Sequence, residues 1–114
     1  MQIDLNADLG EDVGADDALL ALVSSANIAT GAHAGGGQVL ARAVAAAVDR
    51  GVAIGAHPSY RDRVGFGRAS RLGQVRRDPA ERRQFVADLV EPVLLVAGEA
   101  ERNGARLAHV KAHG

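Results

Sequence analysis

The side chains best suited to chemistry in this chain stand in four groups, each near the end of a predicted strand. They are Asn6, Asp8, Glu11, His33, His57, Lys111 and His113. Carboxylates act as general bases or metal ligands, and histidine acts as an acid, a base or a ligand near neutral pH. Because the carboxyl ends of parallel strands meet at one edge of a sheet, we predict that these side chains form a single polar site.

Each group also has an ordinary structural explanation when it is taken alone. Asn and Asp are frequent in turns after strands, and an isolated buried histidine is usually structural. The combination favours a functional site, because three of the four histidines (His33, His57 and His113) lie at predicted strand ends, whereas His109 lies inside a strand. Lys111, the only lysine, follows a buried strand, so its ammonium group is expected to reach the same polar region.

Glycine-rich segments lie close to two of these groups. Residues 35–37 are three glycines before a predicted helix, and their N–H groups could bind an anion, although the pattern is neither a phosphate loop nor a dinucleotide-binding motif. Residues 65–68, Gly-Phe-Gly-Arg, could form a lid in which Arg68 binds a carboxylate. The other arginines of segment 61–83 are predicted to form a solvated face or a partner contact.

The elements that must position these residues alternate between strand and helix. Short apolar runs predict four strands, at residues 3–5 leading into Asn6, and at 27–29, 52–56 and 107–111. Strands that alternate with helices indicate a parallel sheet with right-handed crossovers. The pattern alone does not distinguish a flavodoxin-like sheet from a βα barrel.

Three helices are predicted between the strands. They cover residues 18–23, 38–50 and 79–102. Asp16 is the predicted N-cap of the first helix, and Gly51 stands where the C-terminal cap of the second belongs. Residues 78–81, Asp-Pro-Ala-Glu, are a start signal for the third, inside which Pro92 is expected to kink or divide the helix. Residues 59–73 are expected to be a loop.

The composition limits the classes of protein that fit. The 114 residues suit one domain or part of one, and 47% are apolar with much of this alanine, so a thin core is expected. Without cysteine, disulfides and thiolate metal ligands are excluded. The net charge of −1 argues against nucleic acid as a partner, and no apolar run reaches the length of a membrane span, so a cytoplasmic protein is expected.

The motifs resemble those of the LamB/YcsF family, which includes the A-type component of bacterial 5-oxoprolinase. The matching segments follow the family's order along the whole chain, at residues 4–11, 25–35, 51–58, 65–68 and 109–114. Family members usually have cysteine where Ala7 and Thr30 stand, so no thiol role carries over to this chain. Proline is usual where Ala112 stands.

This resemblance implies an irregular (β/α) barrel of the glycoside hydrolase/deacetylase type. Family chains are longer, so residues 1–114 are expected to form a single domain that is the N-terminal half of such a barrel. The chain is then either a fragment or a half-barrel that associates, for example as a homo-oligomer. The implied reaction is the ATP-dependent opening of 5-oxo-L-proline to L-glutamate, carried out with partner subunits B and C.

For this reaction the hypothesis assigns a role to each residue of the predicted site. The catalytic residues are assigned as Asp8, Glu11, His57 and Lys111. The substrate-binding residues are assigned as Asn6, His33, Arg68 and His113. A divalent metal is a further candidate, with Asp8, His33, His57 and His113 as its ligands. In this scheme a carboxylate is the base toward water, Lys111 neutralises phosphate or developing charge, and Arg68 holds the substrate carboxylate.

Two alternatives from other classes stay open. An aspartate with two or three histidines also suits a metal-dependent deacetylase or amidohydrolase that needs no ATP. Tightly held, stoichiometric metal in the purified protein would favour this alternative. The basic segment 61–83 also suits a non-catalytic assembly subunit that docks on a partner protein, and binding lost on Arg-to-Ala changes there would favour that one.

Overall fold

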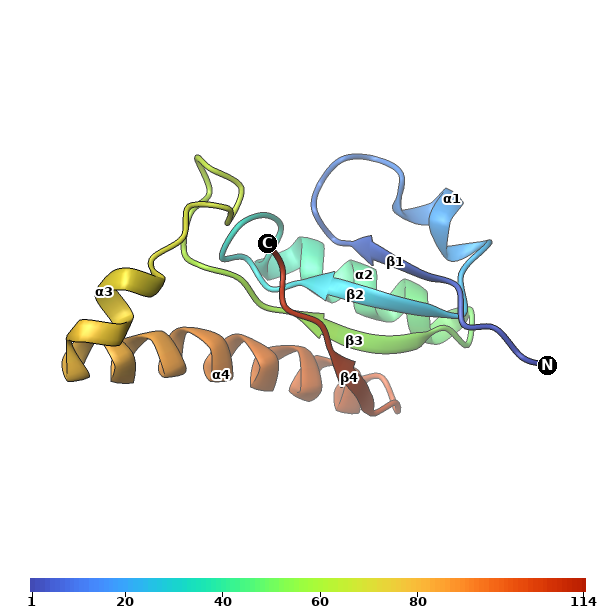
Figure 1. The fold of residues 1–114 in the computed structure, drawn as a ribbon. Helices are drawn as coiled ribbons and strands as arrows, with labels where there is room; N and C mark the ends of the chain where they lie inside the picture. The colour runs from blue at the N-terminus through green and yellow to red at the C-terminus, as the bar shows by residue number, and fades with distance from the viewer.

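The computed structural model describes residues 1–114, which form a four-stranded parallel sheet with its core-forming helices on one face (Figure 1). The strands are β1 (Asn6–Leu9), β2 (Ser25–Ala29), β3 (Ala53–His57) and β4 (Leu107–Val110). They pair in the order β1-β2-β3-β4. This sequential order, with the helices on one face, is that of a βα barrel, whereas a flavodoxin-like sheet has helices on both faces. The predicted α/β class with a parallel βαβαβαβ unit is confirmed.

The helices begin and end at local signals that the sequence carries. They are α1 (Asp16–Leu20), α2 (Gly37–Asp49), α3 (Leu72–Arg77) and α4 (Pro79–Arg102). Asp78 caps α4 as predicted, since its carboxylate accepts a hydrogen bond from the Ala80 N–H, and Pro79 occupies the first turn. Gly51 follows α2 with φ +67°, the left-handed conformation that favours glycine after a helix. No helix combines the length and the apolar character that crossing a membrane would require.

The hydrophobic core lies between the sheet and helices α1, α2 and α4. Its buried residues include Leu9, Leu20, Ala26, Ile28, Leu40, Val44, Ile54, Val96 and Ala100. None of the core residues is aromatic and several are alanine, so the core is as thin as the composition predicts. Burial of these side chains holds one face of the sheet rigid, and the strand ends that carry the polar residues are held with it.

The first strand begins later than predicted. Ile3 and Leu5 do not belong to it, and these residues are 76% and 56% exposed. Pairing with β2 begins only at Asn6, which is opposite Ser25. Upstream of this point the Asp4 carboxylate accepts hydrogen bonds from the hydroxyls of Ser24 and Ser25 instead. Asn6 and Asp8 therefore lie within the strand rather than after it.

Three helix predictions also need correction. Asp16 does not cap α1, because Ala15 precedes the helix and the Asp16 carboxylate accepts a hydrogen bond from the Gly10 N–H. Part of the predicted loop 59–73 is the start of α3, a short helix that packs against α4. Pro92 does not divide α4, which runs unbroken through it (Figure 1). Contacts with α2, α3, β3 and β4 support this helix along its length.

The sheet face opposite the core is polar. Side chains alternate between the two faces of a strand, and the register places Asp8 beside Asn27, Asn27 beside Gly55, and Gly55 beside His109. After β4 the chain continues across the strand ends, where the Lys111 N–H donates to the carbonyl of Ala56. The C terminus then lies beside the loop that follows β2 (Figure 1).

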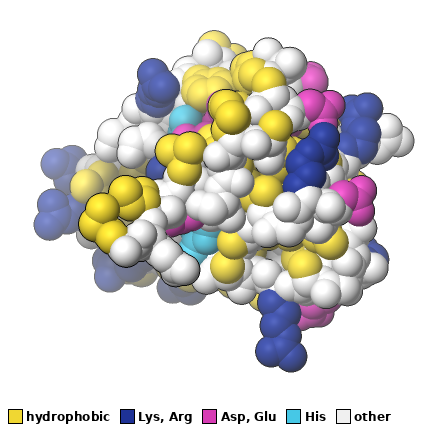
Figure 2. All heavy atoms as spheres, turned by 90° about the vertical axis from the view of Figure 1, so that its right-hand side faces the viewer, with side chains coloured by type: hydrophobic (Ala, Val, Ile, Leu, Met, Phe, Trp, Pro, Cys, Tyr) yellow, Lys and Arg dark blue, Asp and Glu magenta, His cyan; other side chains and the backbone are white.

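The opposite end of the sheet has a mixed surface. Seen from the amino ends of the strands, apolar, acidic and basic side chains are interspersed over the surface (Figure 2). No large patch of one charge sign marks this view. The candidate site is therefore at the carboxyl ends of the strands.

Candidate functional site

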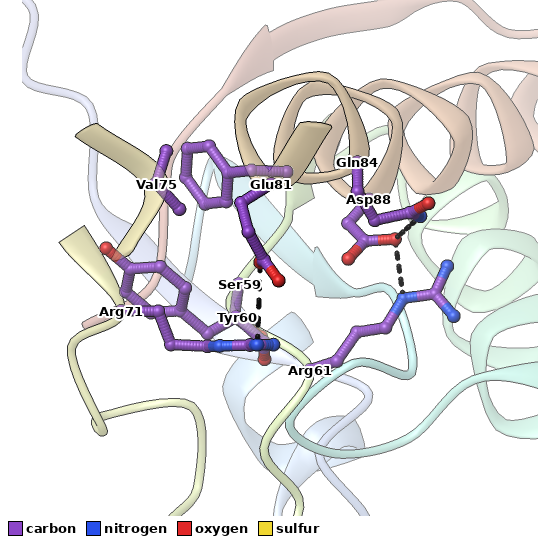
Figure 3. A pocket seen from close by; sticks show the side chains of 9 residues that line it. Ser59, Tyr60, Arg61, Arg71, Val75, Glu81, Gln84 and Asp88 are labelled. Atoms are coloured by element: carbon purple, nitrogen blue, oxygen red, sulfur yellow. Dashed lines mark hydrogen bonds and ion pairs between the residues drawn. The ribbon is translucent and has the colours of Figure 1, made fainter. Parts of the chain in front are cut away.

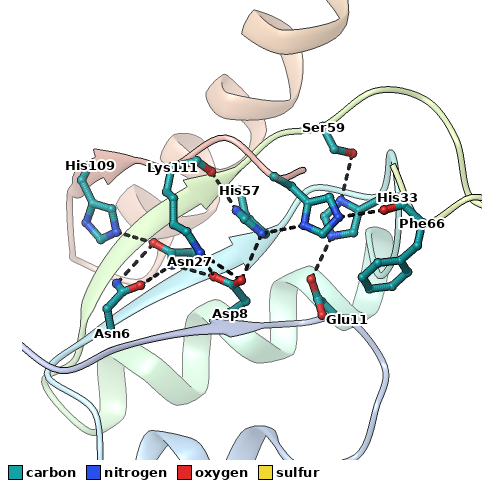
Figure 4. A network of polar contacts seen from close by, with 11 residues as sticks. Asn6, Asp8, Glu11, Asn27, His33, His57, Ser59, Phe66, His109 and Lys111 are labelled. Atoms are coloured by element: carbon teal, nitrogen blue, oxygen red, sulfur yellow. Dashed lines mark hydrogen bonds and ion pairs between the residues drawn. The ribbon is translucent and has the colours of Figure 1, made fainter. Parts of the chain in front are cut away.

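Polar contacts at the four strand ends form two groups, which meet where the rings of His33 and His113 stack with centroids 3.9 Å apart (Figure 4). We refer to the two groups together as the network, and it contains all the predicted site residues except Arg68. They are Asn6, Asp8, Glu11, His33, His57, Lys111 and His113. It also contains residues that the sequence reasoning did not assign to the site. They are Asn27, Ser59 and His109.

Asp8 and Lys111 form the charged pair of the network. The Lys111 Nζ lies 2.7 Å and 3.0 Å from the two carboxylate oxygens of Asp8, and the amide of Asn27 donates to Asp8 Oδ1 at 2.7 Å. Burial raises the pKa of Asp8, but the hydrogen bonds from Lys111 and Asn27 outweigh it and hold the pKa below its usual value. Asp8 is therefore a carboxylate at neutral pH.

Asn27 links this pair to the amino end of the sheet. Its side chain is fully buried and exchanges hydrogen bonds with the amide of Asn6, while its Oδ1 accepts from His109 Nε2 at 2.7 Å. His109 lies across Gly55, where an added Cβ would be 2.1 Å from Nε2. Asn6 thus orients Asn27, and its assignment as a substrate-binding residue stays a prediction.

His33 is buried in the loop after β2 and is held from two sides. Its Nδ1 lies 2.9 Å from Ser59 Oγ, and its Nε2 lies 3.0 Å from Glu11 Oε1. Glu11 reaches His33 because the two loops approach closely: an added Cβ on Gly35 would be 1.8 Å from the Gly10 carbonyl oxygen. Only glycine fits there, at φ +63°. Burial lowers the pKa of His33, which favours the neutral imidazole.

His57 and His113 face each other at the ends of β3 and β4. The His57 Nε2 lies 3.0 Å from His113 Nδ1 and 3.4 Å from Asp8 Oδ2. The other nitrogen of each ring lies 2.7 Å from a main-chain carbonyl oxygen, that of Lys111 for His57 and that of Phe66 for His113. Burial lowers the pKa of His57 as well, so a neutral ring is favoured at pH 7.

Four of these residues are arranged as a candidate metal-binding group. They are Glu11, His33, His57 and His113, and one ligand atom from each lies within 4.8 Å of all the others. The ligand set predicted from the sequence contains Asp8 in place of Glu11. In the structure the Asp8 carboxylate is engaged by Lys111, and Glu11 occupies the position next to His33.

Arg68 and Phe66 lie at the rim of the site. Phe66 packs its ring edge-on against His33 and His113, with ring centroids 5.1 Å and 5.2 Å away. The Arg68 side chain is exposed, and its guanidinium carbon lies 5.7 Å from the centre of the Phe66 ring. Arg68 makes no polar contact with the network, so the structure does not bring it together with the other predicted site residues.

A hollow lies beside the site, between α3, α4 and the loop after β3 (Figure 3). Its charged side chains pair with one another: Arg61 lies 2.9 Å from Asp88, and Arg71 lies 3.7 Å from Glu81. These pairs connect the basic segment to α4, so we interpret the hollow as a structural contact and not as a binding site.

Comparison with known proteins places this geometry in context. The LamB/YcsF family matches residues 3–114. The chain is also similar to a solved structure of a lactam utilization protein from Thermus thermophilus, with 40% sequence identity and a TM-score of 0.85. That match covers 100% of this chain and 45% of the Thermus chain, so the polar site lies wholly within the shared region.

Proposed function

This chain belongs to the LamB/YcsF family, and on that premise we propose that it carries the reacting groups of an enzyme that opens a cyclic amide, 5-oxo-L-proline, to L-glutamate. The observation that carries the proposal is the convergence of Asp8, Lys111 and three histidines on one site at the ends of the four strands. The likeness to a protein named for lactam utilization supports this substrate class.

Opening a lactam requires water to attack a stable amide carbon while the ring nitrogen leaves with a proton. We propose that ATP supplies the activation by transferring its γ-phosphoryl group to the lactam oxygen. Water then adds to the carbon, the C–N bond breaks, and a second water releases phosphate from the resulting acyl phosphate. The products are glutamate, ADP and phosphate.

The charged pair supplies the groups that this scheme needs. Asp8 is the proposed base toward water, because it is ionised at neutral pH and lies 3.4 Å from the ring nitrogen of His57. Lys111 is the proposed partner of the transferred phosphoryl group or of the developing oxyanion. Proton transfer of this kind contributes about 10²–10⁴ in rate.

The proposal includes partner subunits B and C, and Arg68 as the group that holds the substrate carboxylate. Arg68 lies at the rim and is free to turn toward a bound substrate. Arg76 and Arg77 at the end of α3 are exposed, and they supply positive charge for a contact with a partner protein.

The test is ATP-coupled turnover of 5-oxoproline by the protein mixed with subunits B and C. The variant His57→Gln is expected to lose at least 100-fold in kcat while its circular dichroism stays that of the unchanged protein. Arg102→Ala is the control, because the Arg102 side chain makes its polar contacts with Glu99, at the far end of α4 from the site. Turnover by His57→Gln equal to that of the control would contradict the proposed role of this site.

One observation favours a second function, a metal-dependent amidohydrolase that needs no ATP. The group of Glu11 and three histidines has the donor types of a catalytic zinc site. Hydrolysis of amide substrates by the zinc-loaded protein without ATP and without partner subunits would select this function. Loss of that activity with a chelator, and its return with Zn²⁺, would complete the test.

A further inference from the structure

In two histidines at the site, one ring nitrogen donates a hydrogen bond to the main chain. His57 Nδ1 and His113 Nε2 each lie 2.7 Å from a main-chain carbonyl oxygen. A carbonyl oxygen only accepts, so each of these nitrogens carries a proton. In the neutral rings, His57 Nε2 and His113 Nδ1 are therefore bare lone pairs.

Ser59 gives the same result for His33. The Ser59 hydroxyl donates its hydrogen to the carbonyl of Tyr60, at 2.9 Å. Its oxygen is thereby left to accept from His33 Nδ1, also at 2.9 Å. The neutral ring of His33 then presents a bare Nε2 to the carboxylate of Glu11.

Lone pairs consequently face each other without a hydrogen between them. His57 Nε2 and His113 Nδ1 are 3.0 Å apart, and His33 Nε2 is 3.0 Å from Glu11 Oε1. Such contacts repel unless positive charge lies between them. The rings of His33 and His113 are also stacked, with centroids 3.9 Å apart, and His57 meets both rings edge-on, so the three rings are held close together.

We propose that Glu11, His33, His57 and His113 bind one divalent cation, with Zn²⁺ as the best-matched ion. Zn²⁺ readily binds imidazole nitrogen together with a carboxylate oxygen, whereas Mg²⁺ prefers ligand sets made of oxygen alone, so three imidazole nitrogens favour Zn²⁺. With bonds of about 2.0–2.1 Å, tetrahedral ligand atoms are about 3.3 Å apart. Two of the separations here are 3.0 Å and none exceeds 4.8 Å, so small side-chain movements complete the site.

The surroundings support a built metal site. Ligating histidines in proteins almost always donate their other ring N–H to a carbonyl, carboxylate or similar acceptor, which fixes the tautomer and the ring direction. All three histidines do so here. Phe66 makes T-shaped contacts with two of the rings and so places an apolar side chain against this side of the site.

Metal binding is measured directly and does not depend on the reaction proposed above. The protein is freed of metal with a chelator, dialysed, and titrated with Zn²⁺ by calorimetry and with Co²⁺ by visible absorption. We expect one Zn²⁺ per chain, the intense Co²⁺ bands of a tetrahedral site, and no comparable binding of Mg²⁺. Glu11→Gln and His57→Ala are each expected to bind Zn²⁺ at least 10-fold more weakly.

Two further variants separate the site from adventitious binding. His109→Ala is the matched control, because His109 is the one histidine outside the group and is expected to leave the Zn²⁺ affinity unchanged. Ser59→Ala removes the acceptor for His33 Nδ1, together with the hydroxyl that donates to the Tyr60 carbonyl, and is expected to weaken binding by about 10–100-fold. Circular dichroism confirms that each variant is folded.

The proposal is overturned if the folded protein binds no stoichiometric Zn²⁺, or if Glu11→Gln and His57→Ala bind it as tightly as His109→Ala. Turnover of 5-oxoproline by a metal-free protein would leave the proposed reaction standing and remove the cation from it. Zinc bound tightly at these residues, without 5-oxoproline turnover, would support the cation site and contradict the reaction.

Discussion

The close packing beneath the histidines predicts a large penalty for one added methyl group, in the variant Gly67→Ala. Gly67 is buried with φ +69°. A Cβ at this position would lie 2.9 Å from His33 Cβ, 3.0 Å from His113 Cδ2 and 3.1 Å from Ser59 Cβ. These neighbours belong to the polar site and cannot move without disturbing its hydrogen bonds.

Two effects contribute to the expected loss of stability. Holding alanine in the left-handed conformation costs about 1–2 kcal/mol, and forcing extra volume into a packed region costs about 1–3 kcal/mol. The expected total for Gly67→Ala is therefore about 2–5 kcal/mol. Gly51→Ala is the matched control, because Gly51 has φ +67° but nothing within 4 Å of an added Cβ, so it shows the backbone cost alone.

Urea unfolding of the two variants and the unchanged protein measures this difference. Gly67→Ala is expected to lose about 1–3 kcal/mol more than Gly51→Ala, with an unchanged dependence of the unfolding free energy on denaturant. Equal losses in the two variants would refute the inference that the loop is packed tightly against His33 and His113. A loss confined to Gly51→Ala would refute it more strongly.

Two further predictions concern carboxylates. Replacing Lys111 by Met removes the ammonium partner of the Asp8 carboxylate. Because Lys111 is half exposed, the expected loss in the free energy of unfolding is about 1 kcal/mol, measured by urea unfolding at pH 7. The loss should shrink in high salt, and a loss that does not change with salt would argue against a charge effect. Hydrogen bonds from Ser24, and to a smaller extent from Ser25, hold the pKa of the Asp4 carboxyl below its usual value. The ionised Asp4 carboxylate therefore stabilises the folded protein above about pH 4, and this stabilisation is lost as the pH falls through the folded-state pKa. The unchanged protein should therefore lose more stability on acidification below pH 4 than Asp4→Asn does, and identical acid-unfolding curves would contradict this.

The order of strands and helices could be predicted because the local signals agree with the tertiary structure. Asp78 and Gly51 mark helix ends through capping chemistry that acts within a few residues. The start of β1 could not be predicted in this way, because Ile3 and Leu5 alternate as a strand does and yet find no core to cover. Pairing with Ser25 decides where the strand begins, and pairing is a contact between distant residues.

The site was predictable to the extent that parallel strands bring their ends together. The presence of Glu11, and not Asp8, in the candidate metal-binding group could not be predicted, because it depends on the close approach of Gly35 to the Gly10 carbonyl. Asn27 and His109 were missed although the sequence carried a signal for them. An asparagine within a buried strand, and a glycine at the centre of the neighbouring strand, indicate a polar side chain that needs both a partner and space.

Lys111 contributes to the site twice, through chemically separate groups. Its ammonium contacts Asp8, whereas its main-chain oxygen accepts the N–H of His57. The acceptor for His113 is likewise the backbone of Phe66. Substitution of the side chains at positions 66 and 111 therefore keeps the hydrogen bonds that orient the rings of His113 and His57. The orientation of these two rings depends on the path of the main chain, whereas the charge at position 111 and the apolar contact at position 66 depend on the side chains.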